Sequence, residues 1–177
     1  MQRFHRLGAC LLALWLVGCA SPQKKGDQAF EAGEYSQALS YYKDVIDRGT
    51  RDWEVYFRAA QAAARGANFS LAERYYSRAM RYGGGTDVAR KFAEFYLKTS
   101  NYSKAVRLLQ FLLESGADKQ PIYNNLGTAL MYAGNPLDAE SYLMVAQQMD
   151  PSDPVPYVNL GVLYERYLHK PELSIGF

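Results

Sequence analysis

Cationic and amide side chains recur along this sequence at one register. Lys24, Arg58, Lys91, Asn125 and Asn159 follow one another at spacings of 34, 33, 34 and 34 residues. An asparagine amide can donate to and accept from a peptide backbone, and the cations favour acidic side chains or a C-terminal carboxylate. If a fold places these five residues on one surface, they could grip an extended peptide.

Side chains that support catalysis are scarce. After Cys19 the chain contains no further cysteine and a single histidine, His169, which lies in a Leu-His-Lys-Pro turn typical of an exposed loop. The Gly83-Gly84-Gly85 run lacks the Lys-Ser/Thr that follows a phosphate-binding loop. We therefore expect no enzyme, no metal site and no cofactor.

The first 18 residues have the pattern of a signal peptide. Arg3 and Arg6 precede an apolar run over residues 7–17, which is too short for the roughly 20 residues of a membrane-spanning helix. The following Leu16-Val17-Gly18-Cys19 resembles the bacterial lipobox. That resemblance implies cleavage before Cys19, acylation of its thiol and firm anchoring by several acyl chains. The alternative is an ordinary secretory signal with an incidental cysteine.

The residue after the lipobox cysteine indicates whether a lipoprotein is sorted to the inner or to the outer membrane. Ala20 stands where an aspartate would favour retention in the inner membrane under enterobacteria-like sorting. We therefore expect lipid anchoring at the periplasmic face of the outer membrane. Since Cys10 leaves with the signal and Cys19 carries the lipid, the mature domain would have no thiol to misoxidise in the periplasm.

Rows of small residues indicate which helices position Lys24, Arg58, Lys91, Asn125 and Asn159, which we call the ladder. One row consists of Gly26, Ala60, Ala93, Gly127 and Gly161, and a second row, twelve residues downstream, of Ala38, Ala72, Ala105 and Ala139. Small side chains at regular helical positions allow two helices to cross closely. The two rows predict a series of antiparallel helix pairs.

The fourth unit carries the family pattern most fully. Helix residues Tyr123, Leu126, Gly127 and Leu130 precede a Gly134-Asn135-Pro136 turn, and Ala139, Leu143 and Ala146 lead to a closing Asp150-Pro151. The pattern resembles the tetratricopeptide repeat. The resemblance implies an all-α fold, a right-handed α-solenoid of about four and a half units over residues 19–177. The units would span about 19–52, 53–85, 86–119, 120–153 and an incomplete 154–177.

In that family the register of the ladder commonly faces the concave groove of the solenoid. Lys24, Arg58, Lys91, Asn125 and Asn159 are therefore the predicted peptide-groove residues. Asparagine is frequent there even without a defined ligand, so a purely structural role is the alternative. Neighbouring turns should add Gln61, Arg65, Arg90, Glu94, Lys98, Thr128, Met131 and Tyr132.

Two places break the regular period. The single 33-residue step falls between units two and three, most simply at Gly83-Gly84-Gly85, where a hinge or a surface loop could form. The fifth unit ends soon after Pro171, before a second helix is built. We therefore expect Leu160, Leu163, Tyr164 and Leu168 to form an exposed apolar surface at this end. Either the sequence is a fragment of a longer protein, which we favour, or a partner covers that surface.

Charge is distributed unevenly. The 159 residues after the signal carry 18 basic and 18 acidic side chains, yet residues 48–107 have a net charge of +7 and residues 108–177 of −5. Arg74, Arg78 and Arg81 share one helix face. That face could meet anionic lipid headgroups, cell-wall polymer or an acidic protein, or could simply be solvated.

These features together predict a lipid-anchored periplasmic adaptor with a protein or peptide in its groove. We expect neither nucleic acid nor a small-molecule substrate. The combination is similar to the pilotins that escort type IV pilus secretins, which makes a secretin the candidate partner. The alternative is an adaptor that regulates periplasmic proteases or cell-wall enzymes.

Overall fold

The computed structural model of the protein describes residues 21–117 and 119–174, so the predicted signal peptide and Cys19 lie outside the described residues. The helices are α1 (Pro22–Glu31), α2 (Tyr35–Asp47), α3 (Trp53–Arg65), α4 (Phe69–Arg81), α5 (Gly85–Lys98), α6 (Tyr102–Glu114), α7 (Lys119–Tyr132), α8 (Pro136–Met149), α9 (Pro154–Val162), the π-helical turn η1 (Leu163–Tyr167) and α10 (Pro171–Ser174). No strand occurs within these ranges.

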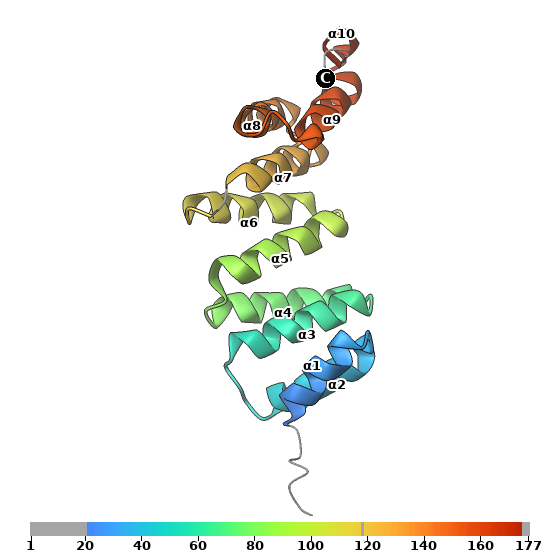
Figure 1. The fold of residues 1–177 in the computed structure, drawn as a ribbon, viewed down its shortest axis with the longest axis vertical. Helices are drawn as coiled ribbons and strands as arrows, with labels where there is room; N and C mark the ends of the chain where they lie inside the picture. Colours follow the sequence, from blue (N-terminus) through green and yellow to red (C-terminus); the bar gives the residue numbers. More distant parts are fainter. Residues whose placement is uncertain (1–20, 118, 175–177) are drawn as a thin grey trace, which may run out of the picture.

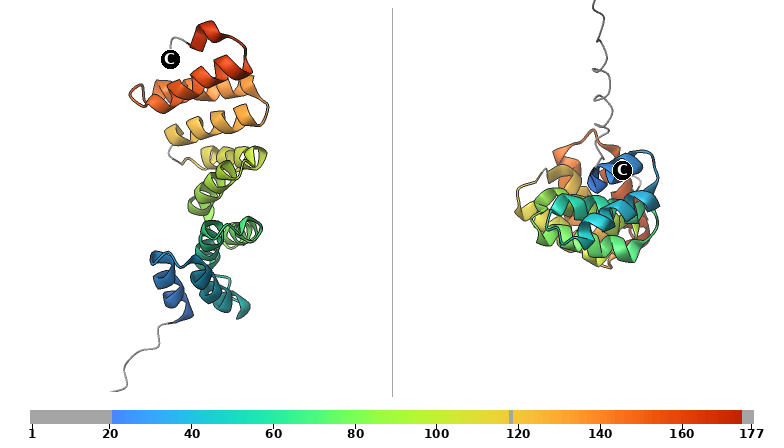
Figure 2. Two further views of the ribbon diagram at one scale, coloured as in Figure 1. Left: turned by 90° about the vertical axis from the view of Figure 1, so that its right-hand side faces the viewer. Right: turned by 90° about the horizontal axis from the view of Figure 1, so that it is seen from below.

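The helices form successive pairs, and the predicted all-α solenoid is confirmed. Each odd-numbered helix from α1 to α7 packs on the next even-numbered one, and each pair also contacts the pair that follows. The pairs are stacked along the longest axis, with α1 and α10 at opposite ends (Figure 1). Figure 2 shows the same stack from its side and from below.

Apart from Gly161, the residues of the two small-residue rows lie where the paired helices cross. Ala38, Ala72, Ala105 and Ala139 are fully buried. A Cβ atom added at Gly26 would lie 2.7 Å from the Tyr42 ring, and one at Gly127 would lie 2.6 Å from Cγ of Leu143. Both distances are shorter than van der Waals contact, so these two crossings require glycine.

Each turn inside a pair contains one residue in the left-handed conformation, seven positions after the small residue of the first helix. These residues are Gly33 (φ +79°), Ala67 (+59°), Ser100 (+58°) and Gly134 (+90°). In the fifth unit His169 has this conformation (φ +54°), eight positions after Gly161. The extra residue is explained by η1, because a π-helical turn takes in one residue more than an α-helical turn.

The C-terminal end differs from our expectation. Leu160, Leu163 and Tyr164 are buried, and only Leu168 is half-buried, so the predicted exposure of this group was wrong. The short helix α10 folds back onto α9 and η1. At Gly161 an added Cβ would meet only the Ser174 carbonyl oxygen, at 3.9 Å, so this glycine is not at a tight crossing.

The connection between α4 and α5 is the shortest of those between pairs. It runs over residues 82–84, whereas residues 115–118 join α6 to α7. Gly83 and Gly85 have φ angles of +108° and +50°. The residue missing from the 33-residue step is therefore lost in this connection, and the packing of α4 on α5 is the sparsest between successive pairs.

At two of the contacts between successive repeat units, a tyrosine of one unit is hydrogen-bonded to a glutamate of the unit before it. Tyr96 Oη donates to Glu73 Oε1 at 2.9 Å, and Tyr164 Oη donates to Glu140 Oε1 at 2.6 Å. Both tyrosines lie three residues after a small residue of the first row, and both glutamates one residue after an alanine of the second row. The same interaction thus joins unit two to unit three and unit four to unit five.

Candidate functional site

The main candidate site is a groove of about 530 Å³ between α3 and α5, the first helices of units two and three. We call it the α3–α5 groove. It is lined by Trp53, Glu54, Phe57, Arg58, Gln61, Asp87, Arg90 and Lys91. Two residues of the predicted ladder, Arg58 and Lys91, thus line one groove, together with the neighbouring Gln61 and Arg90.

The two ladder cations remain half-accessible. Arg58 has a side-chain exposure of 44%, lies 3.9 Å from a Glu31 oxygen and is placed over the Phe30 ring at 5.9 Å. Lys91 has an exposure of 48% and contacts both oxygens of Glu94 at 3.0 and 3.1 Å. Exposed pairs of this kind contribute only about 0–1 kcal/mol, so a ligand carboxylate can compete for both cations.

Aromatic side chains form one wall of the groove. Trp53 and Phe57 are half-buried, with their ring centroids 6.2 Å apart. Behind Phe57 lies Tyr76 of α4, at 6.1 Å between centroids. Burial, with a smaller effect of the Glu94 carboxylate, raises the pKa of Tyr76 to about 12. The rings of Trp53 and Phe57 have no ionisable group, so this wall is apolar at any pH.

Beyond unit three, the ladder residues no longer line the α3–α5 groove. Asn125 lines a separate hollow of about 140 Å³ between α5 and α7, together with Arg90, Glu94 and Pro121. Arg90 borders both this hollow and the α3–α5 groove. Asn125 can therefore extend a binding surface that begins in the groove.

Asn159 has a structural bond instead. Its amide nitrogen donates to Asn124 Oδ1 at 2.9 Å and to Thr128 Oγ1 at 3.2 Å, which ties α9 to α7. Its two N–H groups are thus already used inside the solenoid. Lys24 is exposed on α1 and does not line the α3–α5 groove.

The residues predicted to project from the turns next to the ladder also differ in where the structure places them. Met131 is 1% exposed and belongs to the core, so its predicted projection into the groove was wrong. Tyr132 stacks on Tyr102 of α6, at 4.9 Å between centroids. Arg65 lies over the Tyr35 ring at 5.9 Å, and Lys98 is exposed on the last turn of α5.

Half of the groove lining was not predicted from the sequence. Trp53, Glu54, Phe57 and Asp87 were not singled out, although Glu54 and Asp87 share one register, six residues before Ala60 and Ala93. Their shared register could therefore have identified these two acidic residues as candidates for the groove lining. The aromatic pair had no such signal, because Phe57 corresponds to the cation Arg90 in the next unit.

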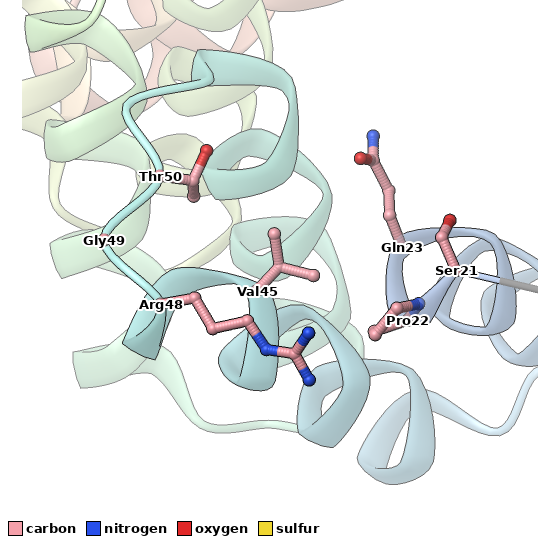
Figure 3. Close-up of a pocket in the computed structure, with 7 residues that line it drawn as sticks. All are labelled: Ser21, Pro22, Gln23, Val45, Arg48, Gly49 and Thr50. Atoms are coloured by element: carbon pink, nitrogen blue, oxygen red, sulfur yellow. The ribbon is translucent and has the colours of Figure 1, made fainter.

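Two other surfaces could bind a partner. Arg74, Arg78 and Arg81 are exposed on α4, and Arg78 lies over the Tyr56 ring at 5.8 Å. A hollow of about 340 Å³ separates the start of α1 from the end of α2 and the loop that follows. Figure 3 shows Ser21, Pro22 and Gln23 on one side of it and Val45, Arg48 and Thr50 on the other.

Other kinds of site are absent from the part of the chain that the structure describes. Within residues 21–117 and 119–174, no three histidine, cysteine, aspartate or glutamate side chains are grouped as metal ligands would be. None of the helices described is long and apolar enough to cross a membrane. His169 is exposed between η1 and α10, as expected of a loop residue.

Comparisons with known proteins agree with this architecture. Tetratricopeptide repeat protein 8 of Caenorhabditis elegans is 27% identical over 143 residues, which are 76% of this chain and 27% of that protein. Among solved structures, MamA from Desulfovibrio magneticus RS-1 has a TM-score of 0.76 at 16% identity, with 85% of each chain covered. YrrB, a TPR protein with an unusual peptide-binding site, has a TM-score of 0.73 at 19% identity, with 85% of this chain and 78% of YrrB covered.

The family follows from a match over most of the chain. The sequence model of the tetratricopeptide repeat matches residues 24–85 and 91–154. Both matched ranges coincide with stacked helix pairs, α1 to α4 and α5 to α8. The chain therefore belongs to the tetratricopeptide repeat family.

Proposed function

We propose that this protein is a lipid-anchored adaptor of the bacterial envelope, which holds a protein partner through the α3–α5 groove. The observation that carries this proposal is the lining of the groove, in which the cations Arg58, Arg90 and Lys91 occur together with the aromatic residues Trp53 and Phe57. Cations beside apolar rings bind peptide side chains well, but the lining offers no nucleophile with an adjacent base. YrrB, with its peptide-binding site, supports the use of this fold for peptides.

The second part of the proposal concerns the location of the protein in the cell. The Leu16-Val17-Gly18-Cys19 pattern supports acylation of Cys19, and Ala20 supports the outer membrane. The chain would then hold its partner at the periplasmic face. Replacing Cys19 by serine should abolish incorporation of labelled palmitate and release the protein from washed membranes. Unchanged labelling would refute the anchor without touching the adaptor role.

Among envelope assemblies, a type IV pilus secretin is the partner we propose. The test is affinity recovery of the full chain from its native membranes, after crosslinking, with the recovered proteins identified by mass spectrometry. We expect a secretin to be recovered, and the double variant Arg58→Ala with Lys91→Ala to reduce its yield about tenfold or more. Recovery of proteases or cell-wall enzymes alone would favour the regulatory adaptor and contradict the secretin.

A matched control removes the same charge elsewhere. Arg74→Ala with Arg81→Ala also deletes two exposed cations, but from α4, outside the groove lining. This variant should keep the yield of the partner. If it loses the partner and the groove variant does not, the docking surface lies on α4 and the proposed site is wrong.

A further inference from the structure

The α3–α5 groove is divided into two zones of opposite charge. Glu54 and Asp87 lie in the first turns of α3 and α5, at equivalent positions of units two and three. Arg58 and Lys91 lie four residues further along the same helices. One helical turn, roughly 5–6 Å along the helix axis, therefore separates the backbone positions of the two acidic residues from those of the two cationic residues.

Within residues 21–117 and 119–174, no salt bridge joins Glu54 or Asp87 to Arg58, Arg90 or Lys91. Arg58 pairs with Glu31 of α1, and Lys91 pairs with Glu94 one turn further along α5. Neither of these partners lines the groove. Glu54 and Asp87 thus line the groove as an acidic zone, and Arg58, Arg90 and Lys91 line it as a basic zone.

This arrangement does not recur in units four and five. The positions equivalent to Glu54 and Asp87 in units four and five are Pro121 and Val155. In unit four the position equivalent to Arg58 is Asn125. The zoning is therefore a feature of the α3–α5 groove and not of the repeat in general.

The aromatic wall adjoins both zones. Trp53 is next to Glu54 in the chain, and Phe57 is next to Arg58, with the two rings on successive turns of α3. An apolar side chain that rests on these rings is placed between the acidic and the basic zone. Its neighbours on either side then meet opposite charges.

We propose that the α3–α5 groove selects a dipolar peptide segment, with an apolar residue between a basic residue on one side and an acidic residue on the other. The basic residue meets Glu54 and Asp87, the apolar side chain packs on Trp53 and Phe57, and the carboxylate meets Arg58, Arg90 and Lys91. A purely acidic segment is rejected by the carboxylate pair, which supplies specificity by repulsion. This inference rests on the proposed adaptor role and names the partner chemistry at the same site.

The test uses the full chain and four fluorescent peptides of equal length. One has a phenylalanine between two lysines and two glutamates, one has only glutamates around it, one has only lysines, and one is dipolar with alanine in place of phenylalanine. Fluorescence anisotropy gives the four dissociation constants. The dipolar phenylalanine peptide should bind at least about tenfold more tightly than each of the other three.

A specificity switch provides the control. Glu54→Gln with Asp87→Asn removes the acidic zone and keeps side-chain size, so it should weaken the dipolar peptide and strengthen the all-glutamate peptide by about tenfold each. Thermal unfolding checks that the variant remains folded. Equal binding of the dipolar and all-glutamate peptides, or a variant without this exchange, would overturn the inference. Recovery of a groove-dependent partner in the membrane experiment would still stand in that case, so the two failures are distinguishable.

Discussion

At the residue scale, the glycines of the first row are not equivalent. A methyl group added at Gly127 would lie within 3.1 Å of Leu143 and of the Ala139 carbonyl oxygen, whereas at Gly161 the nearest atom would be 3.9 Å away. Gly127→Ala should therefore lower the free energy of unfolding by about 1–3 kcal/mol through overpacking. Gly161→Ala should raise it by up to about 1 kcal/mol, because alanine favours the helix. Chemical denaturation measures both, and shifts of equal sign would contradict the crossing geometry.

The Tyr164–Glu140 bridge predicts an alkaline dependence. Burial, and next the bond to Glu140, raises the pKa of Tyr164 from 10.0 to about 12. Since the folded pKa is the higher one, the stabilisation is complete below about pH 10 and is lost as the pH rises through 12. Tyr164→Phe should cost about 1 kcal/mol at pH 8. The difference in unfolding free energy between the two proteins should shrink between pH 10 and 12, and a constant difference would show that the bridge is not formed.

At the element scale, the left-handed residue in the turn inside each helix pair costs more conformational free energy in some units than in others. The residue at this turn position is Gly33 in unit one and Gly134 in unit four, but Ala67 and Ser100, with φ angles near +60°, in units two and three. A side chain in this conformation costs about 1 kcal/mol. Ala67→Gly should therefore raise the unfolding free energy by about 0.5–1 kcal/mol, although glycine usually destabilises.

The matched change at the equivalent turn is Gly134→Ala, which should lower the unfolding free energy by a similar amount, since φ is +90° there. Thermal unfolding of the two variants beside the parent protein is sufficient. If Ala67→Gly is destabilising, the left-handed turn between α3 and α4 is not the conformation in solution.

The elements were largely predictable from the sequence, for a physical reason. A close helix crossing admits only small side chains, so the positions of Gly26, Ala60, Ala93 and Gly127 fixed the register of the pairs. Where this constraint is missing, the prediction failed. At Gly161 an added Cβ would meet only the Ser174 carbonyl oxygen, so this position is not a tight crossing. Leu160 and Leu163 are nevertheless buried, and this end of the chain forms η1 and α10, which the repeat period does not predict.

The candidate site was predictable only in part. Arg58 and Lys91 could be placed by register, because a repeat carries equivalent residues to equivalent surfaces. Asn159 shares that register but bonds to Asn124 and Thr128, since the neighbouring helix offers it acceptors. Which of the equivalent side chains stays open to a ligand thus depends on its neighbour across the joint, and the repeat alone does not specify that neighbour.

At the scale of the whole molecule, charge and shape act together. The segment 48–107, with a net charge of +7, contains the α3–α5 groove, and the segment 108–177 has a net charge of −5. A partner with a negative surface near its binding segment is therefore steered to units two and three. Because Debye screening shortens this range, the association rate should fall as salt increases.

The central claim is that a protein partner lies in the α3–α5 groove. The most direct measurement is site-specific photo-crosslinking of the full chain in its native membranes, with the photoreactive residue at Gln61 in the groove or at Arg74 on α4. We predict a discrete adduct from position 61 and none from position 74. An adduct from position 74 alone, or the same adduct from both positions, would contradict the claim.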